Sequence, residues 1–173
     1  MLELNKKQIK EVISVLNSIS DVRPALKHLC VQKLNNHNML CLCDALMIVA
    51  YEVEVEDDKI DYAIKLDELI KWYKLSSSKD VIDINWINNN LVKISNYPRL
   101  DRLVLFNEDR KIEPISTIAV DASRLNSVQK MLCSDNTEHQ CLNYIFTGSM
   151  KPIYLELHKS INFGLVLPLR TYE

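Results

Sequence analysis

Glycine is scarce in this chain, which has only Gly148 and Gly164 among its 173 residues. Loops that cradle phosphate in Walker or dinucleotide-binding motifs need several glycines within a few positions. The sequence has no segment of this kind. The scarcity of glycine therefore excludes most nucleotide-dependent enzymes.

Long apolar runs and an export signal are also missing. No segment approaches the roughly 18 consecutive apolar residues expected of a membrane-spanning helix. The first residues mix charged with apolar side chains and lack the apolar core of a signal peptide. The cysteines are odd in number, which favours reduced thiols in such a chain; they are Cys30, Cys41, Cys43, Cys133 and Cys141. We expect a cytoplasmic protein without membrane contact or disulfides.

A strong charge of one sign is absent too, because the formal net charge is only -2. Binding to nucleic acid would therefore require positive charge gathered on one face. Hydrophobic residues make up 47% and charged residues 25% of the chain, as in compact globular proteins. A chain of this length can bury a core without disulfides or metal.

Three amphipathic helices are predicted from apolar side chains at helical spacing. They cover residues 5–19, 65–75 and 122–132, and Asp121 is expected to cap the third. Each is followed by segments with strand character. The recurring order indicates an α+β fold, with repeats of a helix packed on antiparallel strands.

Strands are predicted where apolar and polar residues alternate or β-branched residues cluster. Three are expected within residues 23–55, and the others at 60–64, 81–86, 91–94, 115–120, 153–157 and 161–170. The segments 81–86 and 91–94 flank three turn-prone residues, Asn88 to Asn90, and this arrangement predicts a β-hairpin.

Two groups of residues resemble metal sites, but each has a simpler interpretation. His37, Cys41 and Cys43 lack a second ligand pair at zinc spacing, so we interpret both cysteines as buried structural thiols. The acidic residues between Glu52 and Asp58 partly alternate with apolar ones, which is typical of the solvated face of a strand. The sequence therefore predicts no metal and no cofactor.

A cysteine hydrolase is the remaining catalytic possibility. Cys133 lies near His139, but no glycine-rich or helix-opening segment supplies an oxyanion hole beside them. Such an enzyme would require Cys133 to react unusually fast with an alkylating probe. We expect a protein that is not an enzyme and that acts through its surfaces.

Basic residues on the predicted helices are a more suggestive signal, since the acidic cluster falls on a predicted strand. They are Lys6, Lys7, Lys10, Lys71, Lys74, Arg124 and Lys130. One interpretation is a basic helical layer that faces nucleic acid. The other is that lysines simply occupy exposed helix faces, as in most soluble proteins.

Several short motifs also follow one another in a distinctive order. Arg23-Pro24 precedes the strands of LCLCDALMIVAYEVEV, and YAIKLDELIKWYKL then gives a strand followed by a helix. YPRLDRL follows at residues 97–103, and GLVLPLR at 164–170. In this order the motifs resemble those of the bacterial sliding clamp, the ring-shaped processivity factor of replicative DNA polymerase.

This resemblance implies a DNA polymerase processivity or accessory factor with no chemical step. Its basic helices would face the phosphates of double-stranded DNA without sequence preference, and copies would join into a homo-oligomeric ring. Peptides of DNA polymerase or the clamp loader would bind a groove at the positions that match the clamp motifs. These positions are Asp44, Ile48, Pro98, Arg102, Leu103, Leu165, Leu167, Pro168, Leu169 and Arg170.

The departures from the clamp pattern are as informative as the matches. The clamp subunit carries three domains, and this chain is long enough for only part of it. We expect a first clamp-like unit at residues 1–96, a linker at 97–114 and a partial second unit at 115–173. Such a reduced version suggests a phage or another mobile element. The alternative function is a clamp-fold interaction module, a replication regulator or inhibitor that does not encircle DNA.

Overall fold

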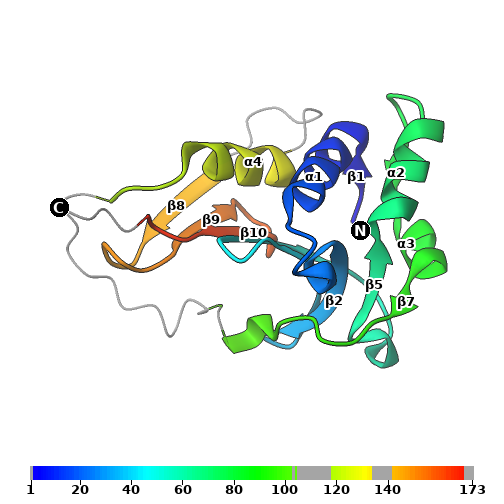
Figure 1. Ribbon diagram of the computed structural model, residues 1–173, viewed down its shortest axis with the longest axis horizontal. Coiled ribbons are helices and arrows are strands. Elements are labelled where there is room, and N and C mark those ends of the chain that lie inside the picture. The colour runs from blue at the N-terminus through cyan, green and yellow to red at the C-terminus, as the bar shows by residue number, and fades with distance from the viewer. Residues whose placement is uncertain (1, 103, 105–117, 134–141, 170–173) are drawn as a thin grey trace.

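A computed structural model describes the chain except for residues 1, 103, 105–117, 134–141 and 170–173 and the side chain of Arg102. Within the described residues, one eight-stranded antiparallel sheet forms the centre of the fold, in the order β7-β5-β2-β3-β4-β10-β9-β8 (Figure 1). Its strands are β2 (His28–Leu34), β3 (His37–Cys43), β4 (Met47–Glu52), β5 (Tyr62–Lys65), β7 (Val92–Lys93), β8 (Leu142–Phe146), β9 (Ile153–Leu157) and β10 (Phe163–Val166). The predicted α+β fold is confirmed.

The three predicted amphipathic helices are present, together with a fourth in the described part of the chain. The α-helices are α1 (Lys6–Ser18), α2 (Leu66–Leu75), α3 (Ile84–Asn90) and α4 (Ala122–Leu132), and short 3-10 turns occur at η1 (Pro24–Leu26), η2 (Asp57–Lys59) and η3 (Leu100–Arg102). Asn5 and Gln8 form a capping box at the start of α1. Asp121 caps α4 as predicted, because its carboxylate accepts the backbone N–H groups of Ser123 and Arg124.

The predicted hairpin at 81–94 is wrong, because its centre is the helix α3. The Asp83 carboxylate accepts the backbone N–H of Trp86 at 2.8 Å and so caps a helix at this point. Asn90 continues the helix and donates its side-chain N–H to the Trp86 carbonyl oxygen. Only the two-residue strands β6 (Val81–Ile82) and β7 remain, and β6 pairs with β1 (Leu4–Asn5) outside the main sheet.

Helices α1 and α4 lie side by side over one face of the sheet, with α2 next to α1 (Figure 1). The Met131 carbonyl oxygen in α4 joins these layers. It accepts the Tyr51 hydroxyl of β4 and the buried Gln8 amide of α1, each at 2.9 Å. Gly164 of β10 lets α4 approach closely, since a Cβ there would lie 2.3 Å from a methyl carbon of Val128.

The opposite face of the sheet is covered around β2 and β3 by the segment from Tyr97 to Leu100. Gln32 pairs with Met39 and Met39 with Glu52, so these three side chains lie on one face of the sheet. Tyr51 precedes Glu52 and therefore points to the opposite face. The Gln32 side chain donates to the Pro98 carbonyl oxygen at 2.8 Å and accepts the Leu100 N–H at 3.0 Å. The central strands are therefore buried on both faces.

The two predicted clamp-like units share this sheet. β4 of the first unit pairs with β10 of the second, from Met47↔Val166 to Ala50↔Phe163. Of the strand expected at 115–120, residues 118–120 are described, and Val120 forms an isolated bridge to Pro168. The division at residues 97–114 stays a prediction. No helix among the described residues is long and apolar enough to cross a membrane.

Candidate nucleic-acid and partner surfaces

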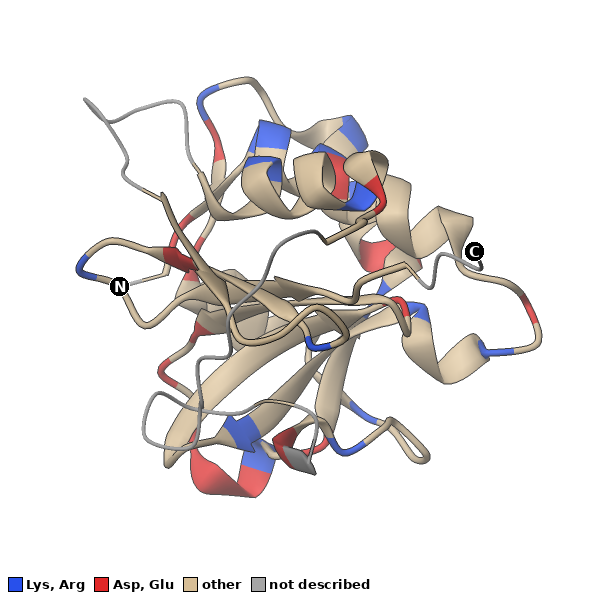
Figure 2. Ribbon diagram, turned by 90° about the vertical axis from the view of Figure 1, so that its left-hand side faces the viewer, with Lys and Arg blue, Asp and Glu red and all other residues tan. Residues whose placement is uncertain are grey.

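The outer side of α1 and α4 carries a lysine-lined groove. α1 turns Ile9, Val12 and Leu16 into the core, so its lysines lie on the outer side. A groove of about 630 Å³ is lined by Lys7 and Lys10 of α1 and by Lys130 of α4, and it also reaches Tyr144 of β8. Figure 2 shows Lys and Arg on the helices above the sheet, with Asp and Glu among them and further Lys and Arg elsewhere in the molecule. We call the surface formed by Lys7, Lys10 and Lys130 the helical groove.

The helical groove keeps positive charge that the protein itself does not neutralise. Lys130 lies 3.3 Å from the Glu11 carboxylate, so these two charges offset each other. Lys10 is exposed, and among the described residues it has no ion-pair partner. An exposed lysine of this kind can meet a phosphate without breaking an internal contact.

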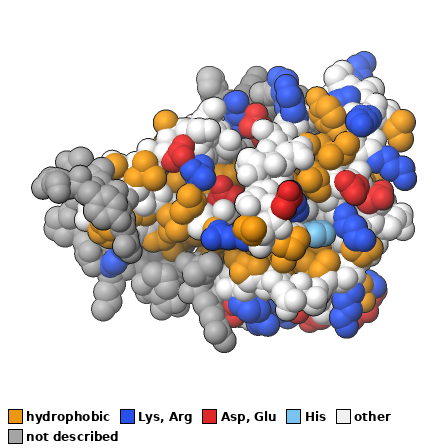
Figure 3. Space-filling model, viewed as in Figure 1, with side chains coloured by type: hydrophobic (Ala, Val, Ile, Leu, Met, Phe, Trp, Pro, Cys, Tyr) orange, Lys and Arg blue, Asp and Glu red, His pale blue; other side chains and the backbone are white. Residues whose placement is uncertain are grey.

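Three further predicted DNA contacts lie around α2, apart from the helical groove. The Lys6 ammonium lies 4.8 Å from the ring centroid of Tyr73 and also donates to the Ser76 carbonyl oxygen. Lys71 lies 3.8 Å from Glu68, and Lys74 is exposed. Figure 3 shows hydrophobic and acidic side chains among the lysines in this part of the molecule, so the basic layer is not continuous.

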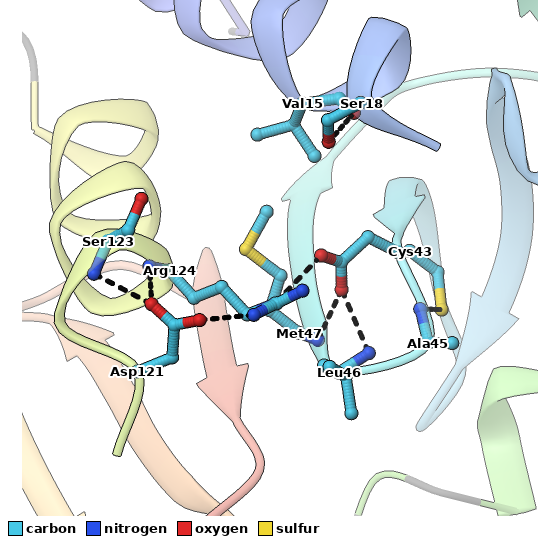
Figure 4. A network of polar contacts seen from close by, with 10 residues as sticks. Val15, Ser18, Cys43, Ala45, Leu46, Met47, Asp121, Ser123 and Arg124 are labelled. Atoms are coloured by element: carbon cyan, nitrogen blue, oxygen red, sulfur yellow. Dashed lines mark hydrogen bonds and ion pairs between the residues drawn. The ribbon is translucent and has the colours of Figure 1, made fainter. Parts of the chain in front are cut away.

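Arg124 belongs to a different environment from the six lysines. Its guanidinium bonds the Asp44 carboxylate at 3.1 Å and also contacts Asp121 (Figure 4). Asp44 in turn accepts the backbone N–H groups of Leu46 and Met47, and its side chain is only 8% exposed. Arg124 therefore ties the β3–β4 loop to the start of α4, and this is a structural task.

Asp121 also makes this corner sensitive to acid. The backbone N–H of Arg124 is the main reason that the pKa of Asp121 lies below its usual value. A lowered folded-state pKa stabilises the fold fully above the pKa of the unfolded chain. That contribution is lost as the pH falls through the lowered value.

Strand β10 and the residues that follow it bring several predicted partner-binding residues together. Ile48 and Leu165 are in register on β4 and β10, and both are buried. Beyond β10 the Leu167 N–H donates to the Leu46 carbonyl oxygen at 2.8 Å, and the Leu169 N–H donates to that of Ala119 at 2.8 Å. Asp44, Leu167, Pro168 and Leu169 therefore lie at one end of the sheet.

Only part of this predicted groove is on the surface. Leu165 is 2% exposed and serves the core, whereas Leu169 is 45% exposed. Leu46, which the sequence analysis missed, is 40% exposed. Pro98 lies beside β2, where its carbonyl oxygen accepts the side-chain N–H of Gln32. Leu103, Arg170 and the side chain of Arg102 are outside the described residues.

A second cleft, between α2 and α3, was also missed. Trp72 and Trp86 form it, and their ring centroids are 6.4 Å apart with the planes at 67°. The cleft has a volume of about 670 Å³. Sequence reasoning placed Trp86 on a strand, and this hid the pairing of the two indoles across neighbouring helices.

The structure gives no support to a cysteine nucleophile. Cys133 ends α4, and burial raises the pKa of its thiol, which disfavours the reactive thiolate. His139 is outside the described residues. Cys41 and Cys43 are buried free thiols, as interpreted from the sequence, while His37 contacts Glu52. Within the part of the chain that is described, no group of three His, Cys, Asp or Glu side chains could hold a metal ion.

Helices packed on one eight-stranded antiparallel sheet make the described part of the chain a mixed α+β fold. The chain is similar to the DNA polymerase sliding clamp of Bacillus subtilis, with a TM-score of 0.53 and 14% identity over 99% of this chain and 64% of that one. It is also similar to the DNA polymerase III beta subunit of Borrelia burgdorferi, with a TM-score of 0.63 and 12% identity over the same shares. This chain thus has the sliding-clamp fold.

The likeness rests on structure alone. No protein-family model matches the sequence, and no curated protein matches it either. Because the chain spans 64% of the length of those two clamps, it lacks a counterpart for about a third of each. Identity of 12 to 14% shows a shared fold and leaves the activity to be proposed.

Proposed function

We propose that this protein is a clamp-like accessory factor of DNA replication that binds duplex DNA without sequence preference. The helical groove carries the proposal, because its lysines lie on the helices that cover one face of a clamp-type sheet. Lysines that meet phosphates through counterion release give affinity without reading bases. The protein does no chemistry and acts in the cytoplasm by holding its partners at DNA.

Removing two of the three groove lysines, one on α1 and one on α4, is expected to weaken duplex binding. In Lys10→Gln/Lys130→Gln, affinity for duplexes of unrelated sequence should fall about tenfold at low salt. The slope of log affinity against log salt should shrink by about 2, since each lost phosphate contact accounts for about 0.9. Fluorescence anisotropy of labelled duplexes over a salt series measures both quantities.

The matched control is Lys33→Gln/Lys159→Gln, which removes two lysines outside the helical groove. Equal losses in both double variants would show that only total charge matters and would contradict the groove. Loss confined to one duplex sequence would indicate direct reading of bases instead.

Self-association is the second part of the proposal, because a sheet of this size can encircle DNA only together with further copies. β8 is an edge strand that pairs only with β9 among the described strands, and Tyr144 and Phe146 on it are exposed. Such an edge can pair with a second copy. Native mass with and without duplex separates a ring from the alternative, an interaction module that stays monomeric and does not encircle DNA.

The exposed surface beyond the end of β10 is the proposed site for peptides of a polymerase or clamp loader. Leu46 and Leu169 are exposed there, and Pro168 stiffens the backbone beside them. Leu169→Ala should reduce binding of a hydrophobic clamp-binding peptide at least tenfold and leave the melting temperature close to that of the wild type. Calorimetry measures the first quantity and thermal unfolding the second.

Leu165→Ala is the control for that experiment, since Leu165 is buried on the same strand. It should cost about 2 to 5 kcal/mol of folding free energy, the usual range for a buried leucine. If Leu169→Ala unfolds as readily as Leu165→Ala, the end of the strand is core and the peptide site is wrong.

A further inference from the structure

The cleft between α2 and α3 combines aromatic and cationic side chains in a way that the helical groove does not. Both tryptophans of the chain, Trp72 and Trp86, are half-buried in it. Neither indole N–H has an acceptor among the described residues. At the rim, Leu75 is 80% exposed. The cleft therefore offers ring surface and hydrogen-bond donors that the protein itself leaves unused.

The charges around the cleft favour an anionic occupant. Glu68 is already paired with Lys71 at 3.8 Å. The Asp80 carboxylate accepts the backbone N–H of Ser77 at 2.6 Å, and it keeps its negative charge. Lys79 lines the cleft and Lys74 follows on α2, and neither has a carboxylate partner in the described part of the chain. Together with Lys71, these two lysines outnumber Glu68 and Asp80, so the charge around the cleft is positive by one.

We propose that this cleft binds single-stranded DNA, with an unpaired base against the tryptophans and the backbone phosphates beside Lys79 and Lys74. Proteins hold single strands by stacking bases on aromatic side chains along a basic surface, and this requires no particular sequence. A base within a duplex is already stacked and paired, so an intact duplex has no free base that could stack on the tryptophans. An uncharged apolar peptide would fill the cleft but leave both lysines without a partner.

This site is independent of the helical groove. Duplex binding depends on Lys10 and Lys130, whereas the cleft depends on Trp72, Trp86 and Lys79. A protein with both surfaces binds next to a junction where duplex gives way to single strand. The two activities can therefore fail separately in an experiment.

Intrinsic fluorescence gives a direct test, because both tryptophans of the chain lie in the cleft. Oligo-dT of about 12 nucleotides, within the usual site size for single-strand binding, should quench the emission in a saturable way that salt weakens. A blunt duplex should not quench it, and Lys10→Gln/Lys130→Gln should leave the quenching unchanged. No quenching by oligo-dT, or equal quenching by the duplex, overturns the proposal.

Variants then identify the contacts, with anisotropy of labelled oligo-dT as the readout. Lys79→Gln should weaken binding severalfold, and Trp86→Leu about tenfold, while Trp86→Phe keeps a ring and should retain most of the affinity. Lys33→Gln is the matched control, since Lys33 is exposed outside the cleft and pairs with Asp57. Equal effects of Lys79→Gln and Lys33→Gln overturn the site, even if Trp86→Leu proves unstable. Binding of apolar peptides without binding of oligo-dT overturns it as well.

Discussion

Gly164→Ala is expected to destabilise the protein by about 3 kcal/mol, at the upper end of the usual cost of overpacking a core. The added Cβ would lie 2.3 Å from a methyl carbon of Val128 and 3.3 Å from the Ile48 carbonyl oxygen. Val128 is a β-branched residue within α4, so its side chain has little freedom to rotate away. α4 would have to lift from the sheet. Denaturant unfolding monitored by circular dichroism measures the loss.

A double-mutant cycle tests the cause. Val128→Ala alone should destabilise the protein by creating a cavity, whereas Gly164→Ala/Val128→Ala should be more stable than the sum of the single changes predicts. A strictly additive result would show that the Gly164 effect comes from the strand and not from its contact with α4.

Asp44→Ala is expected to cost about 2 to 3 kcal/mol of folding free energy. The substitution leaves the N–H groups of Leu46 and Met47 without their acceptor and deprives Arg124 of one of its two carboxylates. Breaking a buried pair costs more than this, but Arg124 is about a third exposed and solvent screens its charge. Thermal unfolding of Asp44→Ala, Arg124→Ala and the double variant measures the coupling.

Asp57→Ala serves as the comparison for that cycle. Asp57 pairs with Lys33 at 3.2 Å, but both side chains are largely exposed, so its removal should hardly change the melting temperature. If Asp44→Ala is equally mild, the bond to Arg124 does not hold the β3–β4 loop to α4. The same set of variants should bind duplex DNA normally, since this corner lies apart from the helical groove.

Local patterns in the sequence predicted the helices well because their causes are local. The apolar stripe of α1 and the cap at Asp121 lie within a few residues of the elements that they define. The hairpin prediction failed because one local signal was weighted above another and above a tertiary contact. Three asparagines were taken as a turn, while the cap at Asp83 and the packing of Trp86 against Trp72 favour a helix. A weak local preference gave way to tertiary contacts.

The candidate sites were harder to predict because they depend on distant pairs. Sequence reasoning assigned Asp44 to a peptide groove and Arg124 to DNA, but the fold bonds these two residues across 80 positions. Likewise, Leu165 and Leu169 share one alternating pattern, yet one is core and the other surface because the sheet ends between them. Lys7, Lys10 and Lys130 line one groove, and their contact with DNA stays a prediction.

The pairing of β4 with β10 has a consequence for how the chain folds. β4 is in the middle of the finished sheet, yet one of its neighbours comes from residues more than a hundred positions later. Before β10 has paired with β4, the apolar segment from Met47 to Tyr51 is an open sheet edge that can pair with another molecule. Contacts so distant in sequence also slow folding, since a long loop must close first. Aggregation during synthesis should therefore depend on how soon the last strand can reach its place.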